Sequence, residues 1–448
     1  TGNNTVQNTT IKSIAGDGIA LDEAVRPIIQ NNTIRQTGGG IHVQKSSPSS
    51  AETSLNTSAT LIGNEIINNT GNGIRVFPGN HTTIINNTIR QNQLGIYIRN
   101  TDAPAIQNNT IADNDGSGMS ATGGIILYDG QNATVIDNNV TNNLGVGITI
   151  RASATNASII GNTVSTSDTK GIVDINVADA DISRNLITKA TTGLRVDKSD
   201  TITTDSNRII NISTGIRIQD DSGFATKNDT IRNVDRSDQA DGALVVVHAP
   251  ATKAQNLTLD RNITVSADIT DAKILPTETP VPPDASGLQN VSTHVDVVPL
   301  GTSSSSIIRA SDVSESYTNL SFQYADADVE NRNESTLRVY QQNSTTDGLQ
   351  YAQQVPGLNI VDTTANVVTA NITQFDSADD GYAPMSEGLA TRDDTYSTSD
   401  GETLTVPEPS GVLGNDSAPD TDTLSADVVS RPKHGPLSPN TNGSFASH

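Results

Sequence analysis

The chain has 448 residues and a formal net charge of -23 at pH 7, with 50 acidic residues against 27 Lys and Arg residues. It contains no Cys and no Trp, which excludes disulfides, thiolate metal sites and Cys catalysis. Because a duplex binder needs a basic stripe to neutralise phosphates, the charge argues against nucleic acid as a partner. No apolar stretch approaches the ~18 residues of a membrane span, so we expect none here.

A repeat of about 22 residues runs through the first part of the chain. Gly followed by an apolar residue recurs at Gly18, Gly40, Gly73, Gly95, Gly124, Gly147, Gly171, Gly193, Gly215 and Gly242. A second apolar series runs in phase at Ile11, Ile34, Ile66, Ile89, Ile111, Val140, Val164, Leu186, Ile209 and Ile231. Two series with one period predict a solenoid, and the wider gaps predict loop insertions.

Alternation within each repeat, as in Ile96-Tyr97-Ile98, predicts strands with one face inward. Such short strands bury their inward Ile side chains only by stacking on the same position of the next coil, so we expect parallel coils spaced ~4.8 Å apart. An Asn precedes most apolar residues of the second series, at Asn32, Asn64, Asn87, Asn109, Asn139, Asn162 and Asn185. This position predicts a turn whose stacked amides form an internal ladder.

Residues 3 to about 270 resemble the right-handed parallel β-helix repeat family on these two series and the Asn corner. That family includes carbohydrate-binding proteins, sugar hydrolases, periplasmic copper-protein maturation factors and many surface proteins. The resemblance implies an all-β fold and leaves the activity open.

The remaining chain is expected to hold two further modules. Glu334 to Tyr340 and Val361 to Ile372 resemble β-sandwich modules that adjoin β-helices in haloarchaeal surface proteins, and the Asp-rich, Lys-poor composition also resembles that of extreme halophiles. Arg392 to Thr398, Gly411 to Asp416 and Arg431 to Gly435 resemble cadherin-like or VCBS-like adhesin repeats. We expect a β-helix over residues 1–273, a Pro-rich linker over 274–287, a β-sandwich (Ig-like) module over 288–388 and a partial cadherin-like domain over 389–448. Because the pattern starts and stops abruptly, we expect a piece of a longer polypeptide.

No catalytic residues are predicted. Asp220 and Asp221 resemble the paired acids of polygalacturonase-like β-helices, but the Gly-His-Gly and basic partners of those enzymes are absent, so we interpret the pair as turn acids. Asp174, Asp179 and Asp181 form a second acidic group without an obvious Lys or Arg base. The six His residues have no metal-ligand spacing, which disfavours zinc and copper and makes each a surface residue by default.

Calcium is the predicted cofactor, because it takes carboxylate and carbonyl oxygens in loops. The candidate ligands are Asp393, Asp394, Asn415, Asp416, Asp420 and Asp422. Turn formation by the same residues is an equal alternative. Glycosylation is predicted at exposed Asn-x-Ser/Thr sequons, namely Asn31, Asn56, Asn80, Asn86, Asn108, Asn132 and Asn156.

These features predict a non-enzymatic extracellular structural or adhesive protein of a cell envelope, filament or virion surface. Its expected partners are surface glycans or other envelope or filament proteins, and a homo-oligomer is left open. The alternatives are a polysaccharide-active β-helix enzyme, as a glycoside hydrolase or lyase, and a glycan-binding module. Tyr97, Tyr128 and Arg99 gathered outward on one flank would favour sugar binding.

Overall fold

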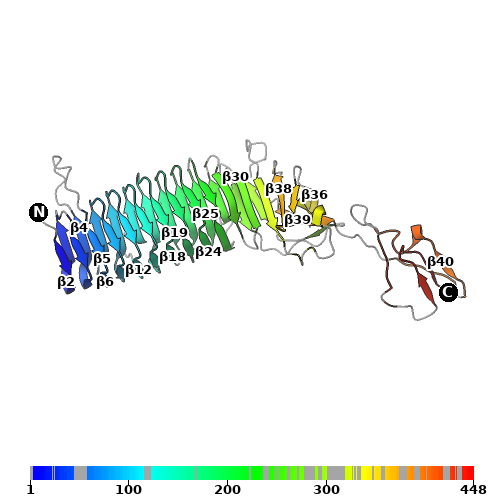
Figure 1. Ribbon diagram of the computed structural model, residues 1–448, viewed down its shortest axis with the longest axis horizontal. Coiled ribbons are helices and arrows are strands. Elements are labelled where there is room, and N and C mark those ends of the chain that lie inside the picture. The colour runs from blue at the N-terminus through cyan, green and yellow to red at the C-terminus, as the bar shows by residue number, and fades with distance from the viewer. Residues whose placement is uncertain are drawn as a thin grey trace. The chain divides into compact units, whose positions relative to one another are not determined.

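In the computed structural model the regular secondary structure of the described residues is almost wholly β-strand (Figure 1). It describes residues 4–22, 24, 26–44, 58–115, 123–166, 169–220, 223–235, 242–247, 249, 252–259, 263–269, 272–276, 288–290, 295–299, 318–324, 326, 329, 334–345, 348–354, 359–372, 381–387, 394–399, 401–416, 424–428, 430 and 436–447. Among these residues the helical segments are two short 3-10 turns, Glu334–Thr336 and Glu408–Ser410. The predicted all-β fold is confirmed.

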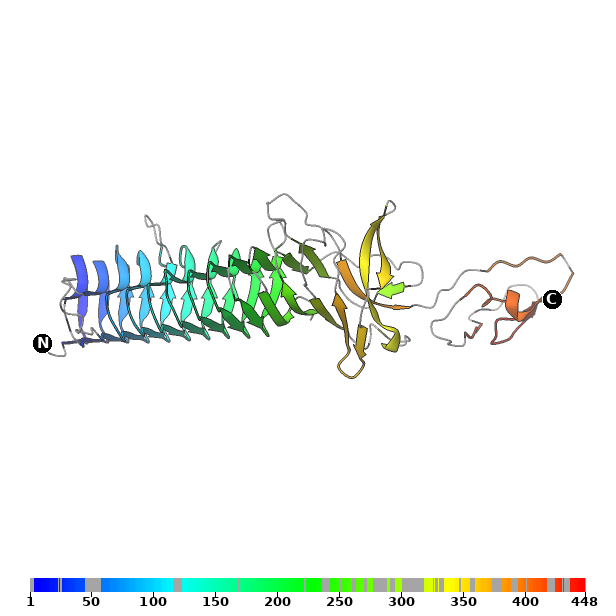
Figure 2. The same ribbon diagram turned by 90° about the horizontal axis from the view of Figure 1, so that it is seen from above.

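The first part of the chain is a parallel β-helix with three stacked sheets (Figures 1 and 2). The first sheet has strands of six or more residues, and we call it the long sheet. It contains β2 (Thr10–Asp22), β4 (Thr33–Gln44), β7 (Asn72–Phe77), β10 (Leu94–Arg99), β13 (Gly123–Tyr128), β16 (Val146–Arg151), β19 (Lys170–Ile175), β22 (Thr192–Asp197), β25 (Thr214–Gln219) and β28 (Gly242–Val247). The second sheet contains β1 (Thr5–Gln7), β3 (Ile28–Gln30), β5 (Thr60–Ile62), β8 (Thr83–Ile85), β11 (Ala105–Gln107), β14 (Thr134–Ile136), β17 (Ser158–Ile160), β20 (Asp181–Ser183), β23 (Thr203–Asp205), β26 (Ala225–Lys227) and β29 (Thr252–Thr258). The third contains β6 (Glu65–Ile67), β9 (Thr88–Arg90), β12 (Thr110–Ala112), β15 (Asn139–Thr141), β18 (Thr163–Ser165), β21 (Leu186–Thr188), β24 (Arg208–Ile212) and β27 (Thr230–Val234).

The recurring Gly of the repeat has a packing reason. In β10, Ile96 aligns with Ile74 on one side and Ile125 on the other, and all three are fully buried. A Cβ added to the preceding Gly95 would lie 2.3 Å from the Gly124 carbonyl oxygen and 2.4 Å from the Ile111 Cγ2. Glycine therefore lets the coils stack closely enough to bury each Ile, a burial that contributes roughly 1.5–3 kcal/mol per side chain.

The predicted amide ladder is present and buried. The Nδ2 of Asn87 donates to the Oδ1 of Asn109 at 3.0 Å, and that residue donates to Asn138 at 2.9 Å. The ladder continues through Asn162, Asn185 and Asn207. Its last acceptor is a carboxylate, since Asn207 Nδ2 donates to Asp229 Oδ1 at 2.9 Å.

Two members of the predicted series are shifted by one residue. Asn139 is exposed on β15, and the buried ladder position is Asn138. Leu186 aligns with Thr163, so the inward residue of β21 is Ile187, which is 1% exposed. In both cases a second residue of the same kind adjoins the correct one, and only the two-residue spacing between the ladder Asn and the inward residue separates them.

A second internal ladder occupies another corner of the early coils. Asn92 Nδ2 donates to Asn114 Oδ1 at 3.2 Å, and Asn114 donates to Asn143 at 2.7 Å. Ala190 and Ile212 are the buried residues at this corner on later coils. Amides therefore give way to apolar packing there, a change that periodicity alone does not predict.

Parallel coiling ends at β29, which pairs antiparallel with β30 (Ile263–Ile269). The strands beyond it are β31 (Ala272–Pro276), β32 (Leu288–Asn290), β33 (Val295–Pro299), β34 (Thr318–Gln323), β35 (Arg338–Thr345), β36 (Gly348–Gln354), β37 (Asn359–Asp362), β38 (Val367–Ile372) and β39 (Gly381–Glu387). Residues 274–276 of the predicted linker lie in β31, and 277–287 lie outside the described residues.

By its contacts the chain divides into two compact units, one of which comprises residues 1–277, 295–321 and 371–380. The other unit ends in a small antiparallel sheet of β40 (Leu404–Val406), β41 (Leu437–Pro439) and β42 (Phe445–Ser447). The proposed β-sandwich and cadherin-like modules, with their boundaries, stay predictions.

Candidate functional site

The long sheet presents a row of alternating aromatic and arginine side chains on its outer face. On β10 the alternation buries Ile96 and Ile98 and turns Tyr97 and Arg99 outward. The register aligns Arg99 with Tyr128 on β13, which in turn aligns with Arg151 on β16. The guanidinium carbon of Arg99 lies 5.3 Å from the ring centre of Phe77 and 5.1 Å from that of Tyr128. We call Phe77, Arg99, Tyr128 and Arg151 the outer row.

Each contact in the outer row is a cation–π pair. The Arg151 guanidinium carbon lies 5.3 Å from the Tyr128 ring centre, so this ring has a cation on both sides. Such pairs contribute about 0.5–1 kcal/mol each at exposed sites, so they favour this arrangement of the side chains without fixing it. Both faces of the Tyr128 ring are therefore covered by arginine side chains, and what the row offers to a ligand is its guanidinium groups, which bind anions. Tyr97, Tyr128 and Arg99 do gather on one flank, which is the arrangement that favours sugar binding over the structural alternative.

A histidine and a carboxylate pair lies on the same face. His42 on β4 places its Nδ1 3.0 Å from an Asp17 carboxylate oxygen on β2, and their side chains are 15% and 36% exposed. This bond holds the Nδ1 proton and leaves Nε2 as the basic nitrogen. Nε2 is shielded from solvent without a hydrogen-bond partner among the described residues, so a substrate reaches it only when a neighbouring side chain moves.

The register sets Arg75 and Tyr97 beside this pair. His42 aligns with Arg75 on β7, which aligns with Tyr97 on β10. Successive strands are ~4.8 Å apart, so a base, a cation and a phenol follow one another along the coil stack. His42 therefore lies on the outer surface, as expected by default, and it is hydrogen-bonded to Asp17 rather than isolated. The sequence does indicate that His42, Arg75 and Tyr97 lie side by side, because each of the three follows the inward residue after the repeat Gly.

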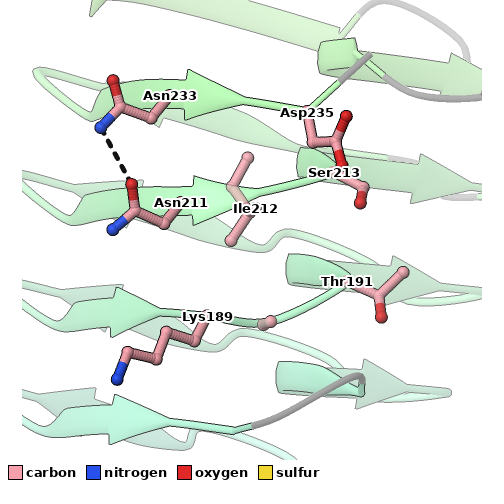
Figure 3. Close-up of a pocket in the computed structure, with 8 residues that line it drawn as sticks. Lys189, Thr191, Asn211, Ile212, Ser213, Asn233 and Asp235 are labelled. Atoms are coloured by element: carbon pink, nitrogen blue, oxygen red, sulfur yellow. Dashed lines mark hydrogen bonds between the residues drawn. The ribbon is translucent and has the colours of Figure 1, made fainter. Parts of the chain in front are cut away.

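A groove of about 360 Å³ lies at the turns that precede β22, β25 and β28 (Figure 3). Its polar lining includes Lys189, Asn211, Ser213 and Asp235, and Asn233 donates to Asn211 at 2.9 Å. The Lys189 and Asp235 side chains come from turns two coils apart, as the close-up shows. They make no paired acid and base, and the groove is a weaker candidate than the outer face.

The acidic residues considered from the sequence do not form a catalytic pair in the described part of the chain. Asp220 is exposed in a turn with a φ of 51°, and Asp221 lies outside the described residues. Asp179 and Asp181 are exposed, and Asp179 also has turn geometry with a φ of 55°. Their interpretation as turn and surface acids fits this geometry.

Part of the predicted calcium site comes together. Asn415 Nδ2 donates to Asp394 Oδ1 at 3.0 Å, and Asp416 adjoins Asn415. Asp393, Asp420 and Asp422 lie outside the described residues. Within the ranges described above, no group of three or more His, Cys, Asp or Glu residues could hold a metal ion. Calcium binding stays a prediction.

The predicted glycosylation positions lie at coil corners. Asn31, Asn86, Asn108, Asn132 and Asn156 are exposed with φ between 50° and 56°, whereas Asn80 is half-buried. Asn56 lies outside the described residues. Asn132 and Asn156 are also linked, since Asn156 Nδ2 donates to Asn132 Oδ1 at 2.8 Å. Exposure permits a glycan at five of these sites, and its presence stays a prediction.

Two families match the β-helix. A family described as the right handed beta helix region matches residues 1–164, and one described as periplasmic copper-binding protein (NosD) matches residues 120–242. The coils are therefore those of a right-handed parallel β-helix, as the repeat predicts. None of the curated proteins matches the sequence of this chain. No helix among the described residues is long and apolar enough to span a membrane.

Several solved structures are similar in fold. The periplasmic alginate epimerase AlgG is 14% identical, with 52% of this chain and 60% of that chain covered and a TM-score of 0.42. The alginate lyase from Paenibacillus sp. str. FPU-7 is 12% identical, with 56% and 95% covered and a TM-score of 0.37. The Dettilon tailspike protein is 12% identical, with 84% and 87% covered and a TM-score of 0.37. The match spans less than two thirds of the epimerase chain.

These comparisons correct one expectation. The sequence predicts that the chain is not an enzyme, whereas the solved β-helices to which it is similar include an epimerase and a lyase of alginate. The sequence left a polysaccharide-active enzyme open as an alternative, but linear motifs did not favour it, because a β-helix builds sites from residues about 22 positions apart on stacked coils.

Proposed function

We propose that the β-helix is polysaccharide-active, binding an acidic polysaccharide along the outer face of the long sheet and acting on it by proton transfer. The observation that carries this proposal is the outer row, in which Arg99 lies between the rings of Phe77 and Tyr128. A planar guanidinium pairs with a carboxylate through two parallel hydrogen bonds. Arg99 and Arg151 lie in register two coils apart, so the row suits a polymer that repeats a carboxylate.

The His42–Asp17 pair supplies the chemistry in this proposal. In a uronate, the hydrogen on the carbon next to the carboxylate is removed as a proton: that C–H bond breaks, an N–H bond forms at His42 Nε2, and the electron pair moves into the carboxylate. Arg75 balances the added negative charge. In the first outcome the electron pair returns to form a carbon–carbon double bond and breaks the bond to the sugar oxygen on the adjacent carbon, and that oxygen takes a proton from Tyr97. In the second outcome the electron pair instead takes the Tyr97 proton on the opposite face of the sugar and forms a new C–H bond there. Solvent restores both side chains.

The two outcomes are a lyase and an epimerase, and one assay distinguishes them. Alginate, polygalacturonate and a neutral polysaccharide are incubated with the protein and followed by NMR for unsaturated ends and for a changed ratio of epimers. We expect change only in an acidic polymer, and His42→Asn should lower its rate at least about 100-fold. The matched control is His81→Asn, because His81 is exposed in a left-handed turn at a corner. Activity unaffected by His42→Asn, or no change in any acidic polymer, contradicts the proposal.

We also propose a location outside the cytoplasm, with glycans as partners. This proposal is supported by the exposure of the Asn86 and Asn108 sequons, because glycans are added to sequons at the surface of secreted proteins. Surface polysaccharides, the proposed ligands, also lie outside the cytoplasm. Mass spectrometry of the protein purified from its source should find glycan on exposed sequons, and an unmodified protein confined to the cytoplasm would contradict this location.

A further inference from the structure

Three cationic side chains gather on the outer face of the long sheet beyond the outer row. Arg195 on β22 aligns with Arg217 on β25, and Lys170 on β19 aligns with Thr192 at the start of β22. This gathering runs against the composition, because the chain has 50 acidic residues and only 27 Lys and Arg residues. The sequence shows no obvious Lys or Arg base for the group of Asp174, Asp179 and Asp181, yet Lys170 lies on the same strand as Asp174, and Arg195 lies on the next strand of the sheet.

Asp197 is the one carboxylate bonded to this group within the described part of the chain. Arg195 donates to an Asp197 carboxylate oxygen at 2.9 Å, and their side chains are 27% and 13% exposed. Among the described residues, neither Lys170 nor Arg217 forms an ion pair with an acid. Three cations therefore face one anion, and stacked cations on strands ~4.8 Å apart repel one another.

Hydrogen-bonding capacity is also left over. Arg195 Nε and Asp197 Oδ1 are both buried and have no hydrogen-bond partner among the described residues. Burial, followed by the charge of Arg195, lowers the pKa of Lys170 and of Arg217. A buried donor and a buried acceptor without partners are costly, so this arrangement suits a ligand that provides both an anionic oxygen and a hydroxyl.

One member of the group, Asp197, lies in line with the outer row. Arg151 aligns with Ile175 on β19, and Ile175 aligns with Asp197, so Asp197 continues the register of the row two coils further on. Two strand spacings are about 10 Å. A ligand that reaches from the outer row to Asp197 is therefore an extended polymer rather than a single sugar.

We propose that Lys170, Arg195, Asp197 and Arg217 form a binding subsite for the oxyanion of an anionic sugar in such a polymer. The three cations donate to the oxygens of a carboxylate or sulfate group, and Asp197 Oδ1 accepts a hydrogen bond from a hydroxyl on the same sugar. The proposal rests on the proposed function only in taking the ligand to be a polysaccharide.

Calorimetric titration at fixed ionic strength tests the subsite with sodium sulfate, an alginate oligosaccharide and a sulfated neutral oligosaccharide. Arg217→Gln should weaken binding of whichever oligosaccharide binds the wild type by about tenfold, as expected for one charge-assisted hydrogen bond. Asp197→Asn should strengthen sulfate binding, because it removes the one opposing charge. Arg184→Gln is the matched control, since it removes an exposed cation at a corner of the β-helix. Preference for the alginate or the sulfated oligosaccharide identifies the oxyanion.

If the wild type and Arg217→Gln bind the oligosaccharide equally, and circular dichroism shows that both proteins are folded, the proposed subsite is wrong. Binding that depends on Arg217 without any turnover supports the subsite and contradicts the proposed chemistry. Turnover that depends on His42 together with no effect of Arg217→Gln does the reverse.

Discussion

Asn138 shows at the scale of one residue how the coils are held together. Its Oδ1 accepts from the backbone nitrogen and the Nδ2 of Asn109, and its own Nδ2 donates to Asn162 and to the Ile106 carbonyl. Each amide thus satisfies buried backbone groups of its neighbours as well as the next amide. The neighbouring Asn139 is exposed on β15; its backbone N–H donates to the Asn109 carbonyl, but its side chain takes no part in the buried ladder.

The contrast between these two residues gives a matched pair of variants. Asn138→Ala should lower the free energy of unfolding by roughly 2–4 kcal/mol, because it leaves several buried groups unpaired. Asn139→Ala should change it by less than about 0.5 kcal/mol. Urea unfolding at fixed salt measures both. Equal effects of the two variants would contradict the ladder register.

Asp229 ends the ladder in a fully buried position. Its carboxylate accepts hydrogen bonds from Asn207, Thr204 and Thr226. Burial raises its pKa, and the hydrogen bonds from the Thr204 and Thr226 hydroxyls and from Asn207 partly oppose this rise. The folded state therefore holds the proton to higher pH than the unfolded state does.

The sign of the pH dependence follows from that difference. Between the ordinary Asp range and the raised pKa the folded state binds more protons, so the contribution of Asp229 to stability is full below this window and falls as pH rises through it. Asp229→Asn keeps the acceptor for Asn207 and should lose this dependence, with a gain in melting temperature at neutral pH. Melting curves over a pH series, wild type minus variant, measure it. A flat difference would show that Asp229 does not titrate in this way.

At the scale of the elements, the sequence predicts strands, parity and stacking well. Alternation about a repeat Gly assigns the inward Ile96 and Ile98 and the outward Tyr97 and Arg99 correctly, because a strand has a period of two. It fails by one residue at Asn139 and Leu186, where two similar residues adjoin. It also missed the His42–Asp17 pair, because the register aligns Asp17 with Gly39 and His42 with Ala20, so the contact depends on the reach of the side chains rather than on equivalent positions in the repeat.

Close stacking makes a second prediction at this scale. Gly124→Ala should destabilise the β-helix by roughly 1–3 kcal/mol, because the added Cβ would lie 2.4 Å from a Val140 methyl and 2.8 Å from the Gly147 carbonyl oxygen. Gly130→Ala is the control, since its nearest contact would be 3.5 Å away. Thermal unfolding compares them. A variant at Gly124 as stable as the one at Gly130 would contradict the packing argument.

For the whole molecule, charge is the dominant feature. With a net charge of -23, the acidic side chains repel one another in the folded chain. Salt screens this repulsion, and the screening length falls from ~10 Å at about 0.1 M to ~3 Å at about 1 M. The melting temperature should therefore rise as sodium chloride is raised through this range at constant pH. Differential scanning calorimetry measures it, and a melting temperature that falls or stays constant would contradict the role of self-repulsion.

The outer row differs from the rest of this acidic chain because it gathers positively charged arginine side chains. An acidic polymer is repelled by most of the surface, so its binding depends on the few places where arginine side chains gather. Arg99 is central in the row, between the Phe77 and Tyr128 rings. Arg90, on β9 of the same coil, belongs to another sheet and provides a control with the same change in charge.

The most direct measurement is the affinity of the wild type, Arg99→Gln and Arg90→Gln for alginate and polygalacturonate oligosaccharides at fixed ionic strength. We expect the wild type and Arg90→Gln to bind at least one of these acidic ligands alike, and Arg99→Gln to bind it about tenfold or more weakly, with no binding of a neutral oligosaccharide of equal length. Wild-type protein that binds neither acidic ligand, or that binds one with an affinity unchanged by Arg99→Gln, would contradict the assignment of the outer face as the polysaccharide site.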